Sequence, residues 1–352
     1  MSLPCGIRNY NYAQDMAIFR TKTHWGMLIV FLVLLFTVPP LTFNHLWLNT
    51  VNTIGITLIA TLGLNILVGY CGQLSIGHAG FIAVGAYTSA ILTNRFDMPF
   101  LVGLIAAGVV AGCVGIIFGL PSVRVKGFYL AITTIAAQFI IIWVINHWGL
   151  TGGFEGISVP YASIGGLVFD SDVKQFYLVM VIVLMAVFVA KNLMRTKVGR
   201  AFIAIRDNDL AAEVMGINVN YYKLLAFFIG CFFAGIAGAL LAHTTYYLNA
   251  EQFSFTDSIL YIGMIIIGGL GTTIGPMLGV TLVKIIQKVL LPIYMVPWLE
   301  NSITSLPAGF ATGLAPIVFG LIIVLFLILE PRGLAHRWNL FKAAYRLWPF
   351  SY

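Results

Sequence analysis

The side chains best suited to polar chemistry are Gln73, Ser75 and His78, which stand in a glycine-rich stretch between long apolar runs. A polar or ionisable group inside an apolar segment is costly, and it usually faces a cavity or a neighbouring helix. Two interpretations remain open: the side chains hydrogen-bond to nearby backbone, or they contact a transported solute or a gate. On the second, Gln73, Ser75, Gly77 and His78 are candidate residues of a translocation pathway.

A second glycine-rich stretch, residues 268–279, begins Gly-Gly-Leu-Gly-Thr-Thr-Ile-Gly-Pro. No soluble strand precedes it and its spacing is wrong for a dinucleotide site. Small residues four positions apart let helix backbones approach closely in lipid, so tight packing is the simpler interpretation. The alternative is that the stretch breaks a helix and lends backbone to a translocation pathway. The candidate pathway residues of this stretch are Gly268, Gly269, Gly271 and Gly275.

The four-residue spacing of small side chains is found in this stretch and in others, and it predicts close helix packing. It is found at Gly271, Gly275 and Gly279, at Gly108 and Gly112, at Gly115 and Gly119, and at Gly230, Ala234 and Gly238.

Motifs for other kinds of chemistry are not found in the sequence. There is no HExxH motif, and the four cysteines form no CxxC pair, so we expect no metal site. There is no GxxxxGK[ST] phosphate loop and no GxSxG serine, so we expect no catalytic residue, no cofactor and no ATP bound by this chain. A membrane-embedded enzyme is a disfavoured alternative for the same reason.

The elements that must position these residues are membrane helices. The 352 residues are 60% hydrophobic and 9% charged, whereas soluble domains are about 25% charged. Apolar runs of about 20 residues, the length that spans a bilayer as a helix, recur along the chain. We predict an all-α, polytopic integral membrane protein with about ten (8–10) transmembrane helices. The expected spans are 27–43, 51–68, 74–92, 100–120, 128–147, 176–190, 224–244, 258–268, a ninth ending near 291, and 312–329.

Charge sets the predicted orientation. With ten spans, most basic residues fall on one side, and loops rich in Lys and Arg face the cytoplasm. The net charge of +7 therefore indicates membrane topology and no nucleic-acid partner. We expect a cytoplasmic N-terminal segment (1–26), a permease domain (27–330) and a cytoplasmic C-terminal tail (331–352). An alternative with eight spans and one re-entrant segment keeps the same orientation.

The longest polar segment, residues 191–223, is predicted to be cytoplasmic and to hold a short helix. Asp207 or Asn208 can cap its start, acids suit its first turn, and Gly216 suits its end. Such a helix, lying between spans, has the form needed to receive movement from a cytoplasmic motor protein. The alternative is an ordinary solvated loop whose basic residues act only as topology signals.

The two glycine-interrupted segments, 69–85 and 268–279, suggest two loosely similar halves. Paired interruptions of this kind can mark a mid-membrane pathway between repeats.

The chain resembles the permease subunits of branched-chain amino-acid ABC transporters, of the LivM type. The residues that carry the resemblance are Gly72–Phe81 with Gly85-Ala86-Tyr87, Gly199–Asn208 with Ala211-Ala212-Glu213 and Gly216, Gly268–Thr272 with Gly275-Pro276, and Glu330–Leu334. The wider importer family has Glu-Ala-Ala, three residues, then Gly. Here Ala211, Ala212 and Gly216 match that spacing, but Leu210 stands in place of the Glu.

The resemblance implies a multi-pass subunit of the bacterial cytoplasmic (inner) membrane. Its implied partners are a second, LivH-type permease, two cytoplasmic ATPase subunits that bind ATP and Mg²⁺, and a periplasmic substrate-binding protein. The residues that would couple it to the ATPase are Arg206, Asp207, Asp209, Ala211, Ala212, Glu213 and Gly216.

The function we expect is therefore that of a non-enzymatic permease in an ATP-driven importer of branched-chain amino acids. One alternative is a permease of the same family for urea, short amides or other small polar solutes. Another is a self-sufficient secondary transporter, which normally needs intramembrane acids that are scarce here.

Overall fold

A computed structural model describes residues 22–125, 127–293, 320–321, 323–326, 328–330 and 332–347. The chain divides into two compact units, Met1–Leu48 and Asn49–Tyr352. The expected N-terminal segment 1–26 and the expected tenth span 312–329 lie largely outside the described residues.

The first unit contains α2 (Lys22–Thr42), which is apolar enough over Trp25–Thr42 to cross a membrane. Pro39 and Pro40 lie in its last turn. A proline removes a helical hydrogen bond, and the helix ends two residues after the second one. This agrees with the predicted end of the first span.

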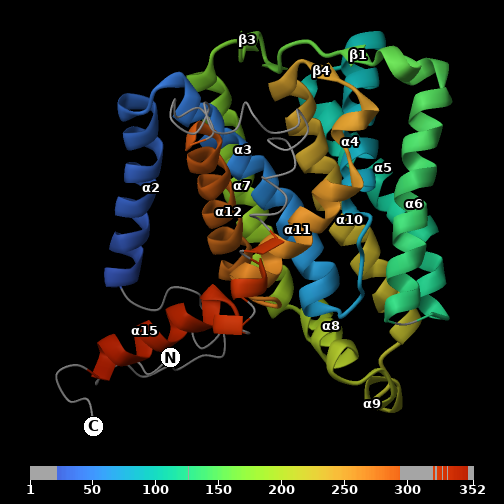
Figure 1. Ribbon diagram of the computed structural model, residues 1–352, viewed down its shortest axis with the longest axis vertical. Helices are drawn as coiled ribbons and strands as arrows, with labels where there is room; N and C mark the ends of the chain where they lie inside the picture. The colour runs from blue at the N-terminus through green and yellow to red at the C-terminus, as the bar shows by residue number, and fades with distance from the viewer. Residues whose placement is uncertain are drawn as a thin grey trace, which may run out of the picture. The chain divides into compact units, whose positions relative to one another are not determined.

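The second unit is a bundle of helices (Figure 1). Its helices, the first of which starts before the boundary between the units, are α3 (His45–Leu64), α4 (His78–Arg95), α5 (Phe100–Gly119), α6 (Phe128–His147), α7 (Asp172–Arg195), α8 (Lys197–Asp207), α9 (Asp209–Val214), α10 (Val219–Thr245), α11 (Phe255–Gly268), α12 (Ile274–Ile293) and α15 (Leu334–Leu347). A π-helical turn, η1 (Asn65–Tyr70), continues α3. Short 3₁₀ turns are η2 (Leu120–Val123), η3 (Gly149–Thr151), η4 (Gly153–Glu155) and η5 (Ala250–Gln252).

Six helical segments within the described residues are long and apolar enough to cross a membrane. They are Trp25–Thr42, His45–Tyr70, Phe100–Val123, Phe128–His147, Asp172–Arg195 and Val219–Thr245. The predicted count of about ten is not confirmed. The expected third span begins with four non-helical residues, 74–77, before α4 starts, and α11 has only 14 residues, about 21 Å of helix against a hydrocarbon core of about 30 Å.

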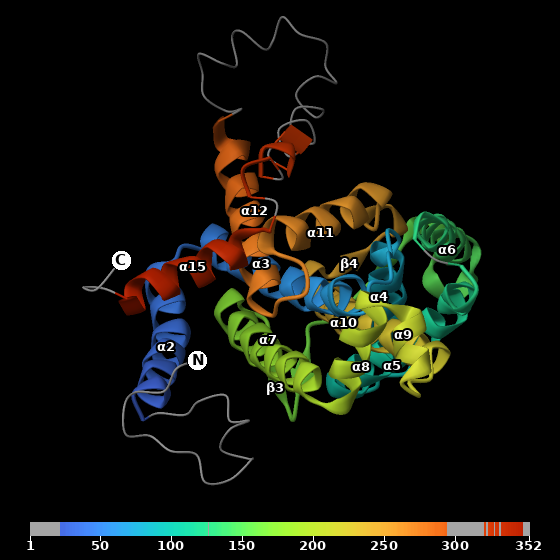
Figure 2. The same ribbon diagram turned by 90° about the horizontal axis from the view of Figure 1, so that it is seen from below.

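Helix α10 packs between α4 and α5 (Figure 2). The approach is close because the contacts are made by glycines. A Cβ on Gly238 would lie 2.1 Å from the Ile82 carbonyl oxygen, and one on Gly115 would lie 2.5 Å from Cys231 Sγ. The predicted packing role is confirmed for the small residues of α5 and α10, where dispersion contacts replace the hydrophobic drive that lipid does not supply.

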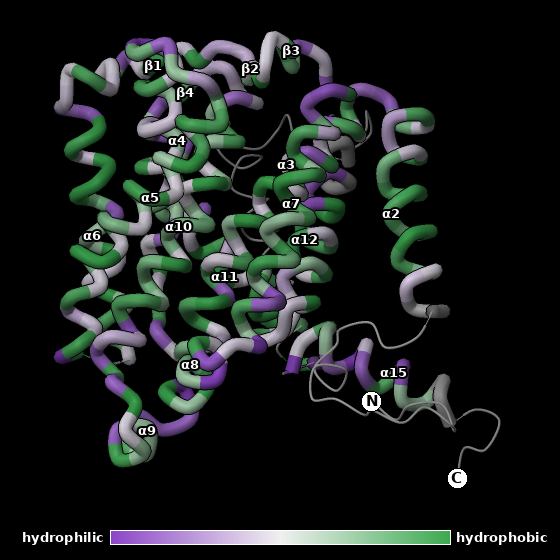
Figure 3. The backbone as a smooth tube through the Cα atoms, turned by 180° about the vertical axis from the view of Figure 1, so that it is seen from behind, coloured by the Kyte–Doolittle hydropathy of each residue, from purple (hydrophilic) through white to green (hydrophobic). Residues whose placement is uncertain are grey.

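Small strands lie at the opposite end of the bundle from α8 and α9 (Figure 1). β1 (Ile157–Ser158) pairs antiparallel with β4 (Tyr247–Leu248), and β2 (Ser163–Ile164) pairs with β3 (Leu167–Val168). The prediction of a helical membrane protein agrees with this, since the strands of the described residues are two residues long each and lie in connecting segments. Hydrophobic residues dominate the helices between the two ends (Figure 3).

Candidate functional site

The polar segment between α7 and α10 is almost wholly helical. α7 ends at Arg195, α8 and α9 follow, and α10 begins at Val219. In the described part of the chain, α8, α9 and α15 lie at the same end of the second unit (Figure 1). Most of residues 191–223 are therefore helical, and the segment is not an irregular loop.

Helix α9 is closed at both ends by the signals that the sequence predicted. The side chain of Asn208 accepts hydrogen bonds from the backbone N–H groups of Leu210 and Ala211. At the other end Gly216 has φ +83°, and the N–H of Ile217 donates to the Ala212 carbonyl at 3.0 Å. This is the Schellman arrangement, in which a left-handed glycine lets the chain turn back onto the last turn.

The guanidinium of Arg206 joins the end of α8 to the end of η1. Its Nη1 donates to the carbonyl oxygen of Gly69 at 3.1 Å, while Nε and Nη2 donate to Asp207 Oδ1 at 3.0 and 2.8 Å. Charge-assisted hydrogen bonds of this kind are stronger than neutral ones. Arg206 is thereby held between a carboxylate of its own helix and the backbone of a distant segment.

Asn65 joins that same turn to the glycine-rich loop between α11 and α12. Its Nδ2 donates to the Thr272 carbonyl at 2.9 Å, and its Oδ1 accepts from the Gly271 N–H at 3.0 Å. The hydroxyl groups of Tyr70 and Thr273 lie 3.2 Å apart. We call Asn65, Gly69, Arg206, Gly271 and Thr272 the Arg206 junction.

Glycine is required at the junction because its segments touch through their backbones. A Cβ on Gly69 would lie 2.5 Å from the Gly271 nitrogen. Gly269 and Gly271 have φ +114° and +70°, where side chains are strained. A Cβ on Gly333 would lie 2.6 Å from the Gly269 backbone. Three of the four stretches that carry the resemblance, those with Arg206, Gly271 and Gly333, therefore meet here.

The roles predicted for the second glycine stretch divide between loop and helix. Gly271 lies in the break between α11 and α12, where a Cβ would lie 2.9 Å from the Gly69 carbonyl oxygen. Gly275 and Gly279 do pack against α11 and its end: a Cβ on Gly279 would lie 1.9 Å from the Met264 carbonyl oxygen. The expected helix break is confirmed over residues 269–273, between the two helices.

The residues around His78 form a separate buried polar group. His78 Nε2 lies 3.0 Å from the Ala60 carbonyl, the backbone contact that one interpretation predicted. Ser75 is fully buried, and its hydroxyl has no hydrogen-bond partner among the described residues. Gln73 Nε2 donates to the Cys71 carbonyl at 3.3 Å. A Cβ on Gly77 would overlap the Thr134 carbonyl, so α4 begins tightly against α6.

This group is linked to α6 and α11. Ser258 accepts from the Ala79 N–H at 2.9 Å and donates to Gln138 Oε1 at 2.7 Å. Gln138 in turn donates to the Phe253 carbonyl at 3.2 Å. The pathway candidates therefore fall into two places, one at the start of α4 and one at the Arg206 junction.

Helix α9 presents an apolar ridge to its surroundings. Leu210, Val214 and Met215 are 70%, 87% and 82% exposed, although they lie outside the apolar spans. Ala211 and Glu213 are exposed as well, and Ala212 is buried against the bundle. Leu210, the departure from the importer motif, belongs to this ridge.

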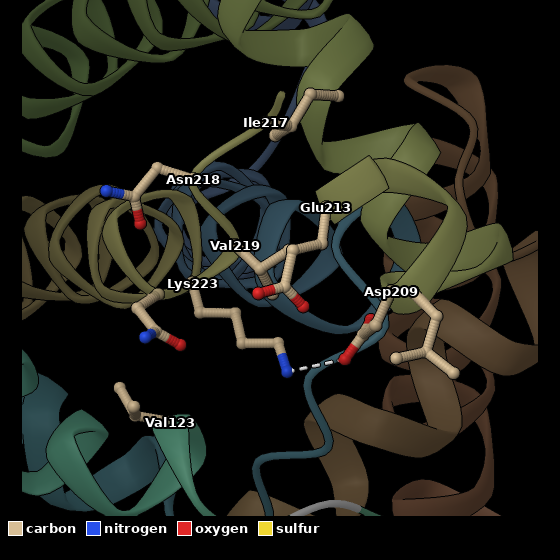
Figure 4. A pocket seen from close by; sticks show the side chains of 9 residues that line it. Val123, Asp209, Glu213, Ile217, Asn218, Val219 and Lys223 are labelled. Carbon is tan, nitrogen blue, oxygen red and sulfur yellow. Dashed lines mark hydrogen bonds and ion pairs between the residues drawn. The ribbon is translucent and has the colours of Figure 1, made fainter. Parts of the chain in front are cut away.

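A half-open pocket of about 370 Å³ separates α9 from the start of α10 (Figure 4). It is lined by Val123, Asp209, Leu210, Glu213, Ile217, Asn218, Val219, Asn220 and Lys223. Lys223 Nζ lies 2.7 Å from Asp209 Oδ2, and Lys223 is 1% exposed. Lys223 is therefore a buried, paired residue of α10 and not a solvated loop residue.

Asn65, Tyr70 and Lys223 were not among the predicted site residues. A lone amide or cation inside an apolar run is costly without a partner, which could have singled out Asn65 and Lys223. The partners themselves are too distant in the sequence to be deduced from spacing. Among the described residues, no group of three His, Cys, Asp or Glu side chains could hold a metal ion.

We expect Asn65→Leu to destabilise the protein by about 2–4 kcal/mol, because a backbone donor and a backbone acceptor lose their shared partner. The measurement is thermal unfolding of the purified protein in detergent. Asn220→Leu is the matched control, since Asn220 is exposed near the start of α10. Equal melting temperatures for the two variants would contradict a structural role for Asn65.

Comparisons with known proteins agree with the resemblance. The family described as "Branched-chain amino acid transport system / permease component" matches residues 46–327. The high-affinity branched-chain amino acid transport system permease protein LivM of Salmonella typhimurium is 31% identical over 233 residues. That alignment covers 59% of this chain and 55% of the relative, so the chain spans about half of that relative's length.

Two further transport permeases also match the chain. The probable branched-chain amino acid transport permease protein LivM of Methanocaldococcus jannaschii is 30% identical, over 66% of this chain and 67% of the relative. The autoinducer 2 import system permease protein LsrC of an Enterobacter species is 26% identical, over 61% of this chain and 62% of the relative. No solved structure matches the chain.

Proposed function

We propose a function from one premise, that this chain belongs to the branched-chain amino acid transport system permease family. It is a multi-pass membrane protein of that family. We infer that it is the transmembrane permease subunit of an ATP-driven importer in the bacterial inner membrane, with branched-chain amino acids as its substrates. It would perform no covalent chemistry.

The observation that carries the proposal is the form of α9. A helix of six residues and its C-cap residue Met215 hold three large apolar side chains out of the bundle. Isolated helices of this length are unstable in water, so the caps and the buried Ala212 are what keep it folded. An apolar ridge on such a helix suits insertion into a groove of a partner protein.

We propose that the partners which fill this role are two cytoplasmic ATPase subunits. They would bind ATP and Mg²⁺, and their movement would reach the membrane through Arg206, Asp207, Asp209, Ala211, Ala212, Glu213 and Gly216. A second permease, of LivH type, would complete the pathway, and a periplasmic binding protein would deliver the substrate. Leu210 replaces an acid in this scheme, and its exposure suits an apolar contact with the ATPase.

The proposed pathway runs beside the two interrupted segments. Two close contacts support this placement of the pathway. The turn at Gly69 touches Gly271, and α4 starts against α6 and α11 through Gly77 and Ser258. Irregular backbone at membrane depth is tolerated where it is buried in protein or lines a cavity. Gln73, Ser75, His78, Gly268, Gly269 and Gly275 accompany these contacts as pathway candidates.

The substrate class follows from the two LivM relatives, while LsrC indicates that permeases with this sequence pattern also serve another solute. A binding protein that recognises the solute would leave the permease with limited selectivity of its own. The ligand of the matching binding protein therefore identifies the substrate.

The test is gentle co-purification of the chain from its native membrane, followed by reconstitution in proteoliposomes. We expect a second permease and ATPase subunits to co-purify, and uptake of radiolabelled leucine, isoleucine or valine to require ATP and the binding protein. Uptake by this chain alone, driven by an ion gradient, would overturn the proposal in favour of a secondary transporter.

Variants of the ridge sharpen that test. Val214→Asp should reduce recovery of the ATPase by about tenfold or more, because a charge would be buried in an apolar contact. Val214→Ile, which keeps an apolar side chain at the same exposed position, is the control for a change at the same helix. Normal recovery of the ATPase with Val214→Asp would remove α9 as the docking element.

A further inference from the structure

Lys223 occupies an environment that lysine rarely occupies. It lies near the start of α10, is 1% exposed, and ranks among the largest fully buried side chains of the described chain. A charged side chain is almost never fully buried unless it is paired, because removal from water is costly. Its Nζ lies 2.7 Å from Asp209 Oδ2, the distance of a charge-assisted hydrogen bond.

The two residues of this ion pair belong to different helices. Asp209 is the first residue of α9, the helix with the exposed apolar ridge. Lys223 belongs to α10, which packs between α4 and α5 and also touches η1 and α7. Figure 4 shows the lysine reaching from α10 across the pocket to the aspartate of α9.

The covalent connection between these helices is short and bends at a glycine. Residues 215–218 join α9 to α10, and Gly216 adopts a left-handed backbone conformation there. Backbone hydrogen bonds of this connection run from the Gly216 N–H to the Glu213 carbonyl and from the Ile217 N–H to the Ala212 carbonyl, so they tie the turn to α9 and not to α10. Beneath α9 lies the half-open pocket, so the backbone packing between the two helices is incomplete on that side.

We propose that the buried Asp209–Lys223 ion pair is the rigid connection through which α9 moves α10, and that Lys223 is a positioning residue for coupling. The inference rests on the proposed function, since it takes α9 as the element that a motor protein displaces. A displaced α9 carries Asp209 with it, and separating the pair would leave Lys223 charged, buried and alone. The cost of that separation makes α10 follow α9.

The test uses the complete reconstituted complex with its binding protein, and the probe is a mixture of radiolabelled leucine, isoleucine and valine. We expect Lys223→Met to assemble and to hydrolyse ATP, but to take up about tenfold less solute for each ATP hydrolysed, a typical coupling effect. Methionine is similar to the lysine stem in volume without its charge, and the Asp209 side chain is 19% exposed, so its carboxylate retains access to water and we expect the variant to fold.

Further variants separate coupling from folding. Lys223→Arg keeps the charge and should retain most of the uptake, and the reversed pair Asp209→Lys with Lys223→Asp should exceed either single charge reversal. Lys197→Met removes an exposed charge of α8 and should leave uptake unchanged. The quantity of monodisperse complex recovered is measured for each variant, and uptake is divided by it.

The outcomes distinguish this inference from the function on which it rests. If the wild-type complex shows no ATP-dependent uptake, the proposed function fails and the inference fails with it. If the wild-type complex is active and Lys223→Met takes up as much solute per ATP, the inference alone is overturned. A reversed pair no better than the single reversals would overturn it as well.

Discussion

Arg206→Met should lower ATP-driven uptake by about tenfold to a hundredfold, within the usual range of coupling between distant sites. The guanidinium binds the Gly69 carbonyl and Asp207 at once, and methionine can make neither bond. The end of α8 would then no longer move with η1 and the glycine loop. The measurement is uptake by reconstituted complexes, with ATP hydrolysis recorded in parallel.

Arg206→Lys tests whether geometry or charge matters at this position. A lysine is a single point charge and cannot reproduce the planar fork of donors, so we expect it to recover only part of the uptake. Arg200→Met is the matched control, because Arg200 is exposed on the same helix and bonds only locally, to the Arg195 carbonyl. Equal uptake by the Arg206 and Arg200 variants would refute the role of the junction in coupling.

Gly268→Val should be strongly destabilising where α11 packs against α12. A Cβ there would lie 1.9 Å from the Gly275 carbonyl oxygen and 2.5 Å from its carbon. These are backbone atoms, so α11 and α12 would have to separate. Overpacking of a core costs about 1–3 kcal/mol and sometimes more, and we expect the upper end, measured as thermal unfolding in detergent.

Gly149→Val is the matched control for that variant. Gly149 has open space around its Cβ position and no left-handed backbone conformation. Its melting temperature should stay close to that of the wild type. If Gly268→Val unfolds at the same temperature as the control, the close approach of α11 and α12 is not what makes glycine necessary.

The features of the coupling segment that could be predicted from the sequence depend on interactions between residues close together in the chain. The Asn208 cap, the glycine turn at Gly216 and the break after Gly268 each depend on residues within a few positions of one another. Backbone hydrogen bonding and φ preference act at that range. The small-residue spacing on α5 and α10 was informative for a similar reason, since it repeats with the period of one helix.

The number of membrane spans was harder to predict, because an apolar stretch is not always one continuous helix. Residues 74–92 are apolar enough to suggest one helix, but Leu74 to Gly77 are not helical and α4 starts at His78. The start of α4 is set by tertiary contacts: the Ile76 N–H donates to Thr134 Oγ1, and the Ala79 N–H donates to Ser258 Oγ. Hydropathy does not register such partners.

By itself, the sequence determined that this is a multi-pass membrane protein, where α9 begins and ends, and which family it resembles, because composition, capping and motif spacing are local properties. Only the tertiary structure decided that Arg206 binds Gly69, 137 residues away, that Asn65 binds Thr272, 207 residues away, and that Lys223 is buried against Asp209. The physical reason is that a buried polar group must find a partner, but many partners satisfy that need, and only the packing of the helices selects one.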